Sequence, residues 1–67
     1  MNFDHEELML MMIYNTGTRL GLMQELRLMQ CYLMPDETAL RELSEGVIEK
    51  LKLMTDAQFA EVEFPMD

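Results

Sequence analysis

The sequence predicts an all-α protein: a small bundle of three helices followed by a short fourth helix near the C-terminus. Helix-start and helix-stop signals divide the chain into four segments. Leu and Met, which are good helix formers, dominate the apolar positions, and the Leu-Met run near the N-terminus has no second strand-like segment to pair with. At 67 residues with 49 % apolar side chains, the chain is one small domain that should fold.

The first predicted helix covers residues 5–15. Asp4 is placed to cap its N-terminus, and Glu7 is placed three residues on to complete a capping box. Phe3 and Leu8 occupy the positions of a hydrophobic staple.

The second and third predicted helices cover residues 19–33 and 36–54. Gly17 ends the first helix because it can adopt the left-handed conformation, and Thr18 can cap the second. Pro35 separates the second helix from the third because proline cannot extend a helix.

The short fourth helix is predicted over residues 56–62. Thr55 is its N-cap, and Gln58 stands at the capping-box position. The resulting division is a single helical domain, 1–62, and an acidic C-terminal tail, 63–67.

Apolar stripes show which helix faces should form the core. Placed at about 100° per residue, one narrow arc of the third helix holds Leu40, Leu43, Val47, Leu51 and Met54. A stripe on the second helix holds Leu22, Leu26, Met29 and Leu33.

The first helix is apolar almost all round. We expect one side to build the core, namely Leu8, Met9, Met12 and Ile13. The other side shares its face with Glu6 and Glu7 and holds Leu10, Met11 and Tyr14. Either this helix is central in the bundle, or its second face meets another chain, a second copy included.

The predicted protein-interaction residues are apolar or aromatic and lie off the expected core stripes. They are Leu10, Met11 and Tyr14, with Leu28 and Tyr32 as a second patch. If all five were simply core, solvent accessibility would show it.

Charge and composition exclude several partners. The formal charge of -8 repels phosphate backbones and anionic lipid, so we expect no direct nucleic-acid binding and no membrane association. The uncharged run from Leu8 to Thr18 is too short for the roughly 20 residues of a transmembrane helix. One cysteine, Cys31, fits a buried thiol in a reducing, cytoplasmic compartment.

The sequence also lacks the residue patterns of catalytic, metal-binding and phosphate-binding sites. His5 is followed four positions later by Met9, so the paired-histidine spacing of a zinc hydrolase is absent. No separated Ser, His and Asp pattern and no phosphate-cradling glycine loop occurs. We therefore predict no enzyme activity, no metal and no cofactor.

Three stretches give the chain a family resemblance. "MNF" before an acidic helix start, "GTR" at the second helix and "LRELSEGVIEKLKLMTDAQFA" at residues 40–60 resemble the transposon-transfer assisting proteins. The resemblance covers nearly the whole chain and implies carriage on a bacterial conjugative transposon, with a helping role in its transfer. It implies no catalytic residue, and it supplies no site residues.

The leading hypothesis is an accessory protein of a conjugative transposon that acts by protein-protein contact, with a component of the transfer machinery as the expected partner. An acidic decoy for a basic DNA-binding protein is one alternative, which salt-sensitive binding would reveal. A small DNA-binding regulator is another, which a gel shift at low salt would reveal. A helix-turn-helix finds little support, because the second helix lacks a basic outer face.

Overall fold

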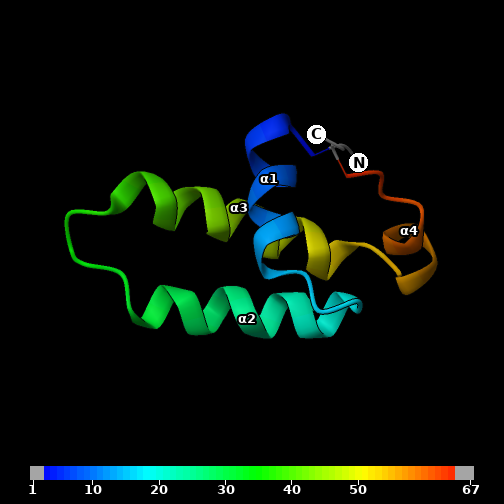
Figure 1. Cartoon of the computed structure of the whole chain (residues 1–67), viewed down its shortest axis with the longest axis horizontal. Helices are drawn as coiled ribbons and strands as arrows, with labels where there is room; N and C mark the ends of the chain where they lie inside the picture. The colour runs from blue at the N-terminus through cyan, green and yellow to red at the C-terminus, as the bar shows by residue number, and fades with distance from the viewer. Residues whose placement is uncertain (1–2, 65–67) are drawn as a thin grey trace.

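The computed structural model describes residues 3–64, and within that range the secondary structure is entirely helical (Figure 1). This confirms the predicted all-α fold of three helices and a short fourth. The four helices are α1 (His5–Tyr14), α2 (Arg19–Cys31), α3 (Thr38–Leu53) and α4 (Asp56–Ala60).

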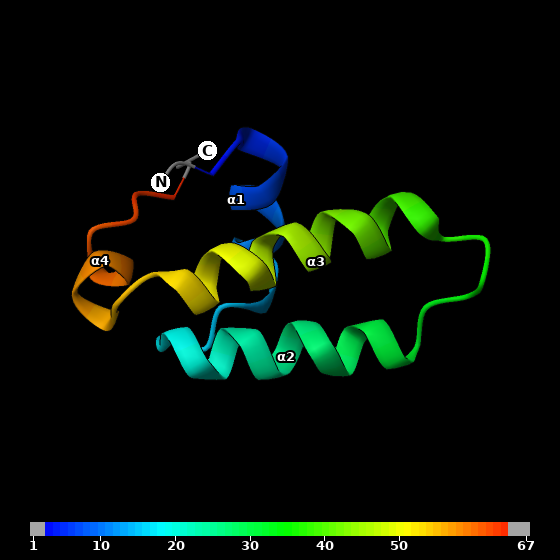
Figure 2. The ribbon, with the colours of Figure 1, turned by 180° about the vertical axis from the view of Figure 1, so that it is seen from behind.

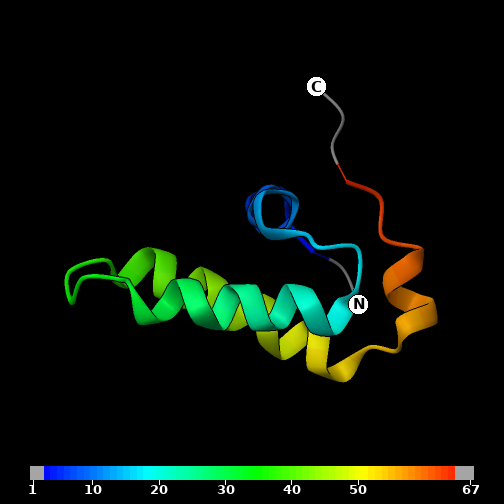
Figure 3. The ribbon, with the colours of Figure 1, turned by 60° about the horizontal axis from the view of Figure 1, so that its bottom comes forward.

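The long helices α2 and α3 run antiparallel as a hairpin, and α1 lies across one face of it. Figure 2 shows the same arrangement from behind, with α3 in front of α1. In Figure 3, α1 is seen nearly end-on above the hairpin, closer to α4 than to the loop joining α2 to α3. The end of the hairpin that carries this loop therefore extends beyond α1.

Local capping residues fix where the helices begin. Asp4 Oδ1 accepts a hydrogen bond from the Glu7 backbone N–H at 2.9 Å, and Glu7 Oε1 accepts one from the Asp4 N–H at 3.0 Å. This is the predicted capping box. Gly17 has φ of 99°, and the Thr18 side chain caps α2 by accepting from Gly21 N–H, which confirms both turn predictions.

The helices α2 and α4 end two residues earlier than predicted. At each of these ends the backbone tightens into i→i−3 hydrogen bonds, which continue the turn but not the α-helix. Tyr32 and Leu33 donate to Met29 and Gln30 after α2. Val62 likewise donates to Phe59 after α4.

The third helix begins at Thr38, two residues later than predicted. Glu37 N–H donates to Met34 O at 3.0 Å and closes a turn around Pro35, so helical bonding starts only beyond it. At the other capping box, Thr55 and Gln58 bond reciprocally as predicted for α4.

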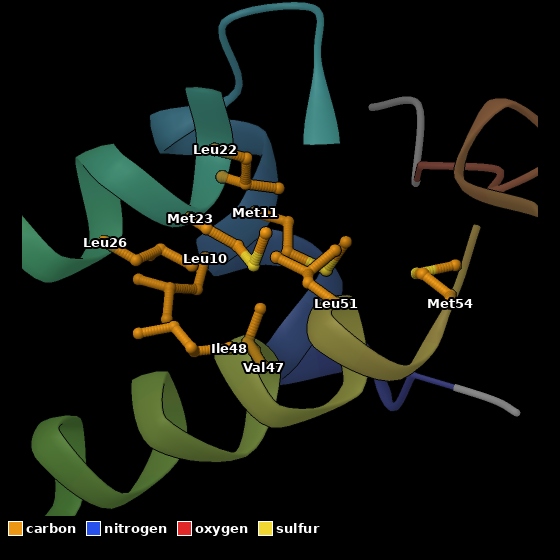
Figure 4. Close-up of a cluster of buried hydrophobic side chains, with 9 residues drawn as sticks. All are labelled: Leu10, Met11, Leu22, Met23, Leu26, Val47, Ile48, Leu51 and Met54. Atoms are coloured by element: carbon orange, nitrogen blue, oxygen red, sulfur yellow. The ribbon is translucent and has the colours of Figure 1, made fainter. Parts of the chain in front are cut away.

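Nine buried apolar side chains form the core between α1, α2 and α3 (Figure 4): Leu10, Met11, Leu22, Met23, Leu26, Val47, Ile48, Leu51 and Met54. The stripes predicted on α2 and α3 point into it. Their outlying members Met29, Leu40 and Leu43 are partly buried and pack against it. Leu33, the last residue of the predicted α2 stripe, is partly buried beyond the end of α2 and is not among the residues of this cluster.

The orientation of α1 is opposite to the prediction. Leu10 and Met11, predicted to be spare, are buried, and Met11 is 0 % exposed. Met12 and Ile13, predicted to be core, are 42 % and 71 % exposed. Of the four residues predicted to be core, Leu8 alone packs against the cluster, and it is partly buried.

An ion pair between buried Glu7 and partly exposed Lys50 is compatible with this orientation and satisfies the buried carboxylate. Glu7 lies on the same face as Leu10 and Met11 because the three residues are spaced three and four apart. Its carboxylate is buried, and Oε1 accepts a hydrogen bond from Lys50 Nζ at 2.6 Å. A Cβ added to Gly46 would lie 3.4 Å from Glu7 Oε2, so α3 approaches this carboxylate closely. The face that looked polar in the sequence is thereby the buried one.

Cys31 is exposed, so the prediction of a buried thiol is wrong. It lies five residues beyond buried Leu26, which places it roughly 140° away around a regular helix. Val62 and Phe64 are partly buried against the core at the end of the described chain, whereas residues 65–67 of the predicted tail lie outside the described residues.

Candidate functional site

The structure separates the five predicted interaction residues into two groups. Leu10 and Met11 are buried in the core and cannot reach a partner without unfolding, so they are withdrawn from the candidate site. Leu28 and Tyr32 are exposed, and Tyr14 is partly buried at the end of α1. These three residues are brought together in one surface hollow.

We call this hollow the tyrosine groove. It has a volume of about 360 Å³, and α1, α2 and α3 all contribute residues to its lining. Its aromatic and apolar lining consists of Tyr14, Leu28, Met29, Tyr32, Leu33 and Leu40. Glu25 is the one charged residue among those that line it.

The α-helical repeat explains how α2 builds one wall of the groove. Glu25, Leu28 and Met29 lie on α2, and Tyr32 follows directly after its last residue with a backbone that is still near-helical. Their spacings of three, one and three residues keep them on one side of the helix. Met29 packs inward against the core, while Leu28 is 52 % and Tyr32 is 79 % exposed. The groove therefore has a packed floor and an open rim.

The opposite end of the molecule is organised around Arg19. Its Nε donates to Asp56 Oδ1 at 2.8 Å, and its Nη1 donates to Leu51 O at 2.8 Å. The guanidinium thereby joins the start of α2 to the end of α3 and the start of α4. The sequence did not predict this three-way contact. Arg19 is 32 positions from Leu51 and 37 positions from Asp56, so no local pattern connects them.

The "GTR" and "MTDAQFA" stretches that carry the resemblance meet at this joint. Gly17 makes the turn and Thr18 caps α2, while Arg19 bonds to Asp56. Thr55 caps α4. Each of these residues has a role in holding the fold.

The polar interior offers no free reactive group in residues 3–64. The buried polar side chains there are Glu7 and Ser44, and both are hydrogen-bonded. Ser44 Oγ accepts from Gln30 Nε2 at 2.7 Å and donates to Arg41 O at 2.9 Å, which ties it to α2 and to its own helix. Within the described range there is also no grouping of three or more His, Cys, Asp or Glu suited to a metal ion.

None of the described helices combines the length and apolar character needed to cross a membrane. The longest, α3, has 16 residues and carries charged side chains on its exposed face.

Comparison with known protein families gives a match that covers most of the chain. The family described as "Putative transposon-transfer assisting protein" matches residues 3–65 of the 67-residue chain. Comparisons with curated proteins and with solved structures give no match.

Proposed function

Because this chain belongs to the transposon-transfer assisting protein family, we propose that it is a non-enzymatic accessory of conjugative transposon transfer that binds another protein through the tyrosine groove. The family supplies the setting of transposon transfer. The groove supports the proposed mode of action, which is binding to another protein.

The observation that supports binding is the convergence of Tyr14, Leu28 and Tyr32 at one site. Tyrosine is enriched among the residues that dominate binding energy, since its ring offers a large apolar area with one polar handle. The sequence contains two tyrosines and no tryptophan, and both tyrosines line this groove. Aromatic side chains are enriched and charged side chains are depleted at the centres of protein-protein contacts, and the lining of the groove has this composition.

Affinity capture tests this function directly. The tagged protein is recovered from the cytoplasm of bacteria carrying a conjugative transposon, after nuclease treatment, and its partners are read by mass spectrometry. We expect a transfer or replication protein to be recovered with the natural chain and lost with Tyr32→Ser. Leu53→Gln is the matched control, because Leu53 is 72 % exposed and lies outside the groove.

Transfer frequency provides the second measurement. We expect deletion of the gene to lower the frequency at which the element moves between cells, and we expect Leu53→Gln but not Tyr32→Ser to restore it. Equal restoration by both variants would refute a role for the groove.

Affinity capture and a gel shift separate the two alternative functions. Recovery of a basic host nuclease or regulator, released by salt and insensitive to Tyr32→Ser, would establish the acidic decoy instead. A gel shift of element DNA at low salt would establish the DNA-binding regulator.

A further inference from the structure

The face of the α2–α3 hairpin that α1 leaves uncovered is open to a further helix. α1 already packs across one part of this face and contacts both α2 and α3. Beyond α1 the two helices continue toward their connecting loop (Figures 1 and 3). The tyrosine groove draws on this part of the molecule, with Tyr14 from the end of α1 and Leu40 from the start of α3.

The pattern along α2 matches what a second helix requires. Apolar anchors of a bound helix recur at spacings of three and four residues, and they fit between side chains of the same spacing on the receiving helix. Leu28, Met29 and Tyr32 provide that spacing at the groove. Met29 adds an adaptable surface, since the unbranched thioether side chain can adjust to the shape of its neighbour.

The negative charge of the site favours a positively charged partner. Within residues 3–64, Glu25 is the one charged residue that lines the groove, and the whole chain has a formal charge of -8. A helix with Lys or Arg beside its apolar anchors is attracted to this surface, while an acidic helix is repelled. Two copies of this chain would each bring the same negative charge to the contact.

Resting on the proposed function, we propose that the tyrosine groove receives a basic amphipathic helix of a partner protein. The helix lies beside α1 on the same face of the hairpin. Its apolar side covers Leu28 and Tyr32, and its Lys or Arg side chains lie near Glu25.

Two synthetic peptides test this partner chemistry. Both are about 18 residues long, a length that marginally supports an isolated helix, and both carry Leu at spacings of three and four. One has Lys and the other has Glu at the flanking positions, and neither contains Tyr or Trp. The intrinsic tyrosine fluorescence of the protein then reports on the groove alone, since both tyrosines of the chain line it.

At about 150 mM salt we expect the Lys peptide to bind at least about tenfold more tightly than the Glu peptide. Leu28→Gln should weaken the Lys peptide about tenfold, while Leu53→Gln, the matched exposed leucine on α3, should leave its affinity unchanged. Glu25→Lys should reduce the preference for the Lys peptide several-fold. Far-UV circular dichroism confirms that each variant is folded.

Equal affinity for the two peptides, or no saturable binding of either, would overturn the proposal, as would Lys-peptide binding that Leu28→Gln does not weaken. A dimer in sedimentation that Leu28→Gln dissociates would also overturn it, because a second copy would then fill the groove. If affinity capture still shows a partner lost with Tyr32→Ser, only the partner chemistry fails and the proposed function stands. If capture shows no dependence on Tyr32, the proposed function itself fails.

Discussion

Replacing Met11 with alanine should destabilise the protein severely, while Ile13→Ala should have almost no effect. Met11 is fully buried and loses three heavy atoms in the exchange, which amounts to roughly 2.4 kcal/mol at about 0.8 kcal/mol per buried methylene. The cavity left behind adds to this, so the expected cost is about 2 to 5 kcal/mol. Ile13 is 71 % exposed, and its replacement should change stability by less than about 0.5 kcal/mol.

Urea unfolding followed by circular dichroism at about 222 nm provides the measurement. A domain of this length has a total stability of roughly 3 to 10 kcal/mol, so Met11→Ala should lower the midpoint by about 2 M or more, or leave the chain unfolded without urea. The paired design matters because both changes introduce alanine into the same helix. A larger loss for Ile13→Ala than for Met11→Ala would refute the orientation of α1 and restore the face predicted from the sequence.

Substitutions at three further positions test other parts of the fold. Glu7→Ala should cost about 2 to 3 kcal/mol in urea unfolding, because it removes both the capping bond and the ion pair with Lys50. Glu7→Gln should cost less, since its amide oxygen still accepts from the backbone. Equal losses would show that the cap contributes nothing. Gly17→Ala should lower stability by about 1 to 2 kcal/mol, visible as a lower Tm, because its φ is 99°, and an unchanged Tm would argue against that turn. Gly46→Ala should raise stability by about 0.5 to 1 kcal/mol in the same melt, since alanine favours the helix. Its Cβ would make ordinary van der Waals contact with Glu7 Oε2 at 3.4 Å. A loss of stability would mean that this contact is too tight.

The candidate site was predictable in part. Tyr14, Leu28 and Tyr32 were identified because they are apolar or aromatic and lie off the expected core stripes. Their meeting in one groove was not predictable, since it depends on how α1 crosses the hairpin. Leu10 and Met11 were included because the first helix is apolar all round and its wheel favours no face.

Local chemistry in the sequence determined the helices themselves. The capping boxes at Asp4 and Thr55 and the turn at Gly17 each depend on residues within about four positions, so they can be recognised without knowledge of the fold. The apolar stripes also predicted most of the inward-facing residues of α2 and α3, although the core residues Met23 and Ile48 lie outside those stripes.

Only the tertiary structure decided which side of α1 faces inward. Glu7 and Lys50 are 43 positions apart, and their 2.6 Å contact allows a carboxylate to lie within the bundle. A carboxylate is costly to bury unless it is paired and hydrogen-bonded. No local sequence pattern shows that another helix supplies a lysine to pair with Glu7. The same long-range reason applies to Arg19, whose bonds to Leu51 and Asp56 join three helix ends that are distant in the chain.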